Sequence, residues 1–197
     1  MNAFRRLLAM PAEPAYVPNM TQLMTAEDLL QPGVPKHAQL VRGVLVVREP
    51  PGFRHGEIMV RLASELMMHV DAHNLGRVVA GDAGFKLQSQ PDTVRGADIA
   101  FVSWERLPQQ SPAGFPSLGP DLVVEILSPG DRPGETLAKV ADWLSAGTRL
   151  VWVIDAERQL ARVYRADGTE TTLDAHGALD GEDVLPGFSS ALASVLG

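Results

Sequence analysis

The sequence predicts a fold of the α/β (α+β) class, in which a mixed β-sheet packs against helices. Three observations support this prediction. Short apolar runs typical of strands recur along the chain, a long amphipathic stripe spans residues 54–74, and a second helical segment at residues 133–146 lies between two of the runs. A chain of 197 residues with 45% hydrophobic residues is also long enough for one well-packed core and short for two.

We therefore expect one domain over residues 21–197 and a flexible arm over residues 1–20, which contain Pro11, Pro14 and Pro18. The apolar stretch at residues 7–10 is too short for a signal peptide, and no run reaches the roughly 18 apolar residues of a transmembrane helix. The chain has no cysteine, which excludes disulfides and thiolate-bound zinc. These features fit a cytoplasmic protein.

The first half of the predicted domain starts with a short helix and a hairpin. Thr25 is a plausible N-cap for a helix that extends to about Leu30. The runs AQLV and VLVV flank Arg42 and Gly43, and a glycine supplies the positive φ of a tight hairpin turn. In the amphipathic helix at 54–74, apolar residues recur every four positions: Ile58, Leu62, Leu66 and Val70.

Strands dominate the remainder of the chain. Two strands, RVVA and AGFKLQ, are predicted on either side of Gly81 and Asp82, followed by GADIAFV at 96–102. A proline-rich surface loop at 105–120 leads into DLVVEILSP at 121–129. After the helix at 133–146, the predicted elements are a buried strand and a hairpin, then a short C-terminal helix: RLVWVID, LARVYR with TETTL, and PGFSSALASVLG.

Two of these strands each carry one acid among aliphatic residues, Asp98 and Glu125. Burying an ionised carboxylate costs several kcal/mol unless a cation or strong hydrogen bonds compensate. Two such acids on neighbouring strands suggest a divalent metal such as Mg²⁺, which accepts oxygen ligands and can also hold a phosphate and a water. Lys139, on the helix that follows, could orient that water and offset transition-state charge.

The chain resembles the bacterial Uma-two family of restriction endonucleases, within the PD-(D/E)XK nuclease superfamily. The resemblance runs from about Met24 to the C-terminus. It depends on a combination of motifs: MTAEDLL, QLVRGVLVV, a histidine at the start of the long helix, GADIAFV, DLVVEILSP, a helix lysine and TRLVWVID.

The resemblance implies a restriction-endonuclease-like fold and a Mg²⁺-dependent DNA endonuclease, with Mn²⁺ as a possible substitute and a homodimer as the expected assembly. It places Asp98 and Glu125 as the two metal-binding acids and the backbone carbonyl of Ile126 as a further ligand. Lys139 would be the catalytic lysine, while Gln39 and His55 would support the pocket.

The chain departs from the family pattern at three positions. The superfamily lysine two residues after the second acid is replaced by Leu127, so the family lysine corresponds to Lys139. Gln39 stands where the family usually has Glu, which leaves an amide ligand without charge. Ala97 replaces the proline before the first acid, which is a change in the backbone rather than in the chemistry.

Each candidate residue also has a purely structural interpretation. Asp98 could cap a turn or pair with Arg95, and Glu125 could face water on an edge strand. Lys139 could form a helical ion pair with Glu135, opposite an apolar stripe of Leu137, Val140, Ala141 and Leu144.

The remaining histidines and tryptophans have similar alternatives. His55 could be an exposed residue in the first turn of its helix. His69 and His73 could ligate a metal from one helix face, but exposed positions are preferred because no third ligand is evident. Trp104, Trp143 and Trp152 fit the core or its rim.

Three functions are compatible with the sequence. The first is the Mg²⁺-dependent endonuclease, and the second is a catalytically degenerate relative that binds nucleic acid or a protein. The second is motivated by Gln39 and by the formal net charge of −7, which lacks the basic excess typical of nonspecific nucleic-acid binding. The third is a glycosidase acid pair, in which the lysine would have no role.

Overall fold

Strand β4 is the central element of the fold. The structure, a computed structural model, describes residues 23–108 and 114–197, so the predicted arm at 1–20 lies outside the described residues. In the described part, eight strands form a sheet in the order β2-β1-β4-β5-β6-β7-β8, with β3 also paired to β4. These strands are β1 (Ala38–Val41), β2 (Val44–Val47), β3 (Gly76–Gln88), β4 (Thr93–Ser103), β5 (Leu122–Ile126), β6 (Leu150–Asp155), β7 (Leu160–Arg165) and β8 (Glu170–Asp174).

β4 pairs with different strands at different points along its length. β3 pairs with β4 along most of its length, whereas β1 pairs with it at Val94 and β5 pairs with it over residues 99–101. Asp98 therefore lies between the point where β1 joins β4 and the point where β5 joins it. This stretch of β4 forms part of the candidate site.

β5 and β6 are parallel neighbours, and α3 (Pro133–Ser145) connects them. Every residue of both strands is buried, which explains their nearly continuous apolar runs. The loop between β5 and α3 returns the chain across the end of the sheet, so α3 begins close to the end of β5. Glu125 and Lys139 can meet because of this crossover.

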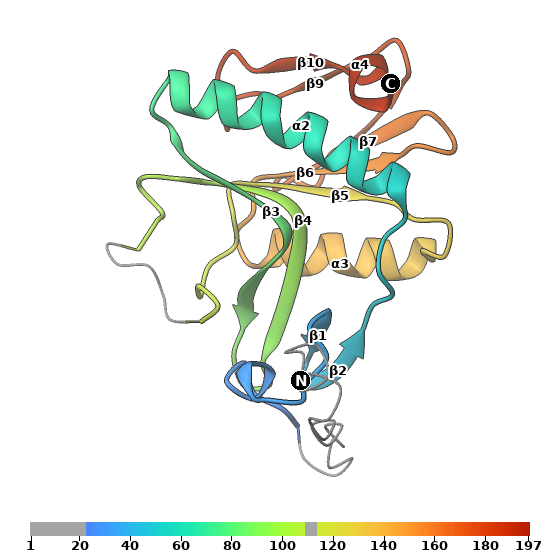
Figure 1. The fold of residues 1–197 in the computed structure, drawn as a ribbon. Helices are drawn as coiled ribbons and strands as arrows, with labels where there is room; N and C mark the ends of the chain where they lie inside the picture. The colour runs from blue at the N-terminus through green and yellow to red at the C-terminus, as the bar shows by residue number, and fades with distance from the viewer. Residues whose placement is uncertain (1–22, 109–113) are drawn as a thin grey trace, which may run out of the picture.

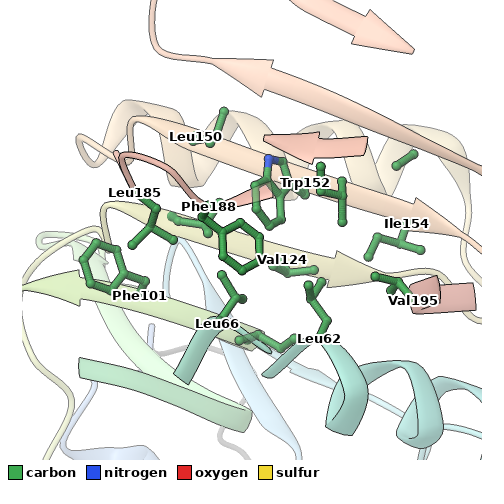
Figure 2. Close-up of a cluster of buried hydrophobic side chains, with 14 of the residues drawn as sticks. Leu62, Leu66, Phe101, Val124, Leu150, Trp152, Ile154, Leu185, Phe188 and Val195 are labelled. Carbon is green, nitrogen blue, oxygen red and sulfur yellow. The ribbon is translucent and has the colours of Figure 1, made fainter. Parts of the chain in front are cut away.

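Helices cover both faces of the sheet (Figure 1). α2 (Phe53–Ala72) lies on one face together with α4 (Leu192–Leu196) and the hairpin of β9 (Ala178–Asp180) and β10 (Ser189–Ala191), and α3 lies on the other. The predicted stripe of α2 is fully buried in the larger core cluster, where Leu62 and Leu66 pack among side chains from the sheet and the C-terminal segment (Figure 2). The fold is a mixed α+β fold, as the sequence predicted.

The structure differs from the predicted elements in three places. The two strands predicted around residue 81 are one long strand, β3, with a bulge. The first helix is a single 3-10 turn (Asp28–Leu30) whose N-cap is Glu27 and not Thr25; in the turn that precedes it, the backbone N–H of Thr25 donates to Asp28 Oδ2 and the backbone N–H of Asp28 donates to Thr25 Oγ1. The C-terminal segment begins with β10, and α4 is five residues long. The β9–β10 hairpin was missed because its strands are three residues each, too short for a periodic pattern.

No helix in the described part of the chain combines the length and hydropathy of a membrane span.

Candidate active site

A cleft of about 470 Å³ opens beside the middle of β4 and the end of β5. Its walls come from β1 and β2, from the connection between β2 and α2, and from the β5–α3 loop with the first turns of α3. All six residues that the sequence assigned to a site line this cleft: Gln39, His55, Asp98, Glu125, Ile126 and Lys139. Residues separated by up to a hundred positions therefore meet in one place.

Asp98 is buried and held by two donors. The backbone N–H of Ile126 donates to its Oδ2 at 2.7 Å, and His55 Nε2 lies 3.2 Å from the same oxygen. Burial alone would raise the pKa of Asp98, but the hydrogen bond from His55 and the charge of Lys139 outweigh it and lower the pKa. Asp98 is therefore an anion at neutral pH, and the pairing with Arg95 does not occur, because Arg95 binds Asp142 at 2.6 Å.

Glu125 is buried at 6% exposure in the central strand β5, so the edge-strand interpretation is wrong. Lys139 Nζ donates to its Oε2 at 2.6 Å and Trp143 Nε1 donates to its Oε1 at 2.8 Å. Burial, and to a smaller extent the negative charge of Asp98, raise the pKa of Glu125 from its usual 4.5 to about 7. The positive charge of Lys139 opposes this rise but does not cancel it. The two acids of the site thus differ in how readily they ionise.

Lys139 faces the sheet, not the solvent. Its exposure is 8%, whereas Leu137, predicted on the buried face, is 51% exposed. The alternative ion pair is absent too, since Glu135 contacts Arg132 at 3.7 Å. The physical reason is Glu125, which accepts hydrogen bonds from Lys139 and from Trp143, four positions later on the same helix face. These two bonds fix which face of α3 is buried.

His55 is buried in the first turn of α2 and not exposed there. Burial lowers its pKa, but the hydrogen bond and charge of Asp98 outweigh this and raise it above 6.5. Its Nδ1 is buried without a hydrogen-bond partner among the described residues. His55 therefore reaches the site from α2 and stabilises the ionised form of Asp98.

Gln39, on β1, contributes an amide to the same cleft. The residue is 5% exposed, and its Oε1 has no hydrogen-bond partner in the described structure. A buried carbonyl oxygen without a partner costs about 1–3 kcal/mol. The protein thus keeps an acceptor free at the position where the family pattern has an acid.

The other sequence candidates lie outside the cleft. His69 of α2 and His73, which follows the helix, contact each other with ring centroids 4.3 Å apart, and His69 Nε2 lies 3.2 Å from the carbonyl of Pro186. Trp152 is fully buried, and Trp104 is half exposed. His73 is exposed as expected, whereas His69 is half-buried beside Phe188.

Two residues of the site were missed by sequence reasoning. Trp143 was assigned to the core or its rim without a partner, and its spacing of four from Lys139 is the signal that could have placed it beside Glu125. Asp82 lines the cleft from the bulge in β3. Its signal was the Gly81-Asp82 pair, which was interpreted only as a break between strands.

The Uma2 family model, described as "Putative restriction endonuclease", matches residues 26–193. The chain belongs to the Uma2 family. No curated protein matches it in sequence.

A solved structure confirms the fold of this Uma2 protein. It is the crystal structure of a "putative nuclease belonging to DUF820" from Anabaena variabilis, which aligns with a TM-score of 0.78 and 19% sequence identity over 88% of this chain and 97% of the other. The family assignment supports a nuclease function, and the solved structure supports the fold.

The two buried titrating groups predict how the stability of the metal-free protein depends on pH. Both folded-state pKa values are raised, Glu125 to about 7 from 4.5 and His55 above 6.5. Each group therefore stabilises the fold fully below its unfolded pKa, and this contribution is lost as the pH rises through the folded pKa. We expect the free energy of unfolding, measured with urea in the presence of a chelator, to fall between about pH 5 and pH 8.

Glu125→Gln should flatten this decline, whereas the exposed Glu49→Gln should leave it unchanged. The same slope in Glu125→Gln and in the wild type would show that Glu125 does not titrate in this range.

Trp143 is expected to position Glu125 through its indole N–H. Trp143→Phe keeps a ring in the core but removes a donor to a buried carboxylate, so we expect a loss of about 1.5–3 kcal/mol in the free energy of unfolding. Trp104→Phe is the matched control, since it also removes an indole N–H bond, to Asn74, at an exposed site. The loss should shrink when Trp143→Phe is made in Glu125→Gln; equal losses in both backgrounds would assign it to packing alone.

Proposed function

We propose that this Uma2 protein is a Mg²⁺-dependent endonuclease that hydrolyses phosphodiester bonds in DNA. The observation that carries the proposal is the convergence of Asp98, Glu125 and Lys139 at the base of one cleft. These are the three positions that the family pattern assigns to catalysis. DNA, a homodimer that cuts both strands and a cytoplasmic location are parts of the same proposal.

The donor atoms of the cleft fit a divalent cation of the magnesium type. Asp98 and Glu125 would supply carboxylate oxygens, the carbonyl of Ile126 would be the adjacent backbone ligand, and Gln39 has an Oε1 without a hydrogen-bond partner among the described residues. Hard oxygen ligands of this kind suit Mg²⁺ and Mn²⁺. A bound cation would supply Lewis-acid stabilisation of negative charge on the phosphate.

The charge of the cleft also favours a role for a cation. The basic residues Arg48 and Lys139 line it together with six acids. The acids are Glu49, Asp82, Asp98, Glu125, Asp131 and Glu135. Arg48 is already paired with Asp131 at 2.9 Å. A phosphate would therefore be repelled from the cleft unless a cation offsets these charges.

Lys139 has the position of a catalytic group. Its ammonium is buried beside Glu125, where a charge–dipole interaction is stronger than in water. From there it would hold the attacking water by a hydrogen bond and stabilise the charge that develops on the phosphate oxygens. In a glycosidase acid pair, the lysine would have no such role.

A binding module without catalysis is the second candidate. Both carboxylate oxygens of Glu125 already accept hydrogen bonds, and Gln39 replaces an acid. Such a protein would bind nucleic acid or a protein partner and would not respond to cations.

The two acids provide the first test. Asp98→Asn and Glu125→Gln should abolish Mg²⁺-dependent nicking of supercoiled plasmid DNA, because each removes a charged ligand without changing side-chain size. Glu135→Gln, which also removes an acid from the cleft wall, should retain cleavage. Thermal unfolding of each variant reports whether the fold is intact. Metal-dependent cleavage that survives in both Asp98→Asn and Glu125→Gln would rule out the nuclease proposal.

Lys139→Met separates catalysis from metal binding. We expect cleavage to fall about 10²–10³-fold, as when a transition-state donor is lost. Mn²⁺ binding measured by calorimetry should persist and tighten, because the ammonium no longer competes for Glu125. Lys36→Met, at an exposed lysine, is the control. Full cleavage activity in Lys139→Met would remove Lys139 from the mechanism.

A further inference from the structure

A bulge in β3 lies directly opposite Asp98. The register pairs Ala80 with Ile99 and then Ala83 with Ala97, so two residues of β3, Gly81 and Asp82, face a single residue of β4, Asp98. Both bulge residues have positive φ, 84° at Gly81 and 59° at Asp82. A bulge re-aims the side chain that it carries, and aspartate is among the residues that tolerate this backbone region. The bulge turns Asp82 toward the cleft, which it lines.

Gly96 brings Asp82 and Gln39 together. A Cβ added at Gly96 would lie 3.3 Å from Asp82 Oδ1, 3.3 Å from Gln39 Nε2 and 3.1 Å from the backbone oxygen of Asp82. The carboxylate and the amide therefore approach the same glycine, two residues before Asp98 on β4. Any larger side chain at this position would push one of them away.

The Gln39 amide is the independent sign of a ligand. It is buried, it lines the cleft, and its Oε1 has no hydrogen-bond partner in the described residues. Among those residues, no three Asp, Glu, His or Cys side chains form a cation site by themselves. Beside the two carboxylates of Asp98 and Glu125, a cation in this cleft would therefore also depend on neutral oxygens and on charge from groups that do not contact it directly.

We propose that Asp82 supplies, across the hydration shell of the bound cation, the negative charge that Gln39 lacks. The inference rests on the proposed function, because it concerns the same metal site. Mg²⁺ usually keeps several of its waters, so a carboxylate beyond direct contact can still hold it through them. Gln39 then ligates through its free Oε1, and Asp82 completes this side of the site.

The contact between Asp82 and His37 is weak enough for a bound cation to replace it. His37 Nδ1 lies 3.6 Å from Asp82 Oδ2, and the two side chains are 50% and 36% exposed. An exposed pair of this kind contributes little to stability. A divalent cation on the cleft side would compete effectively for the same carboxylate.

Mn²⁺ calorimetry on the full chain tests the proposal with four proteins (the wild type, Asp82→Asn, Gln39→Glu and the double variant) and two controls, Glu49→Gln and Glu125→Gln. Asp82→Asn should weaken Mn²⁺ binding about tenfold or more, as loss of an outer-shell partner does. Gln39→Glu should tighten it. In the double variant the effect of Asp82→Asn should be much smaller than in the wild type, because the carboxylate introduced by Gln39→Glu would then carry the charge.

Glu49→Gln is the matched control, since it removes one charge from an exposed acid of the same cleft. Asparagine tolerates the positive φ of residue 82, so Asp82→Asn keeps the bulge, and thermal unfolding verifies this.

The outcomes distinguish this inference from the proposed function. If Asp82→Asn and Glu49→Gln bind Mn²⁺ equally, while Glu125→Gln loses binding, the role of Asp82 is overturned and the metal site stands. Equal losses from Asp82→Asn in both backgrounds would overturn the compensation for Gln39. A wild-type protein that binds no Mn²⁺ would overturn both proposals.

Discussion

The buried ion pair between Glu125 and Lys139 is the constraint on which the candidate site depends. Taking two charges out of water is expensive, and removing one partner of such a pair costs about 3–5 kcal/mol because the other charge remains buried. The pair fixes the face of α3 that packs on the sheet, and Trp143 completes the shell of Glu125. On that face of the sheet α3 buries Val140 and Trp143 against Val123, Val151 and Val153.

The same cleft illustrates how acids can be held close together without a ligand. Asp98 has its own side-chain neighbour, His55, and a backbone donor, Ile126. Each acid is therefore compensated by a different element, α2 for Asp98 and α3 for Glu125. The two helices lie on opposite faces of the sheet (Figure 1), so the cleft is supported from both sides of β4 and β5.

Much of this arrangement could be predicted from the sequence, for identifiable reasons. The stripe of α2 is long and periodic, and the runs of β5 and β6 are nearly continuously apolar, so the burial of all three follows directly. The acids at 98 and 125 were identifiable because charges interrupt apolar strands. The buried face of α3 was predicted only in part: Val140 is buried as expected, but hydrophobicity favoured Leu137, which is exposed, while a partner on a distant strand selected Lys139. The bulge at Asp82 was missed for a similar reason: only the pairing with β4 distinguishes a bulge from a strand end.

The β5–α3–β6 crossover has a consequence for the newly made chain. Trp143 packs against Val151 and Val153 of β6, so the placement of α3, and with it Lys139, depends on a strand that is synthesised after it. During translation the acids at 98 and 125 leave the ribosome first, without the element that positions the amine. The candidate site can therefore assemble only after most of the polypeptide has emerged, and a truncated product that ends before β6 would lack the positioned ammonium of Lys139.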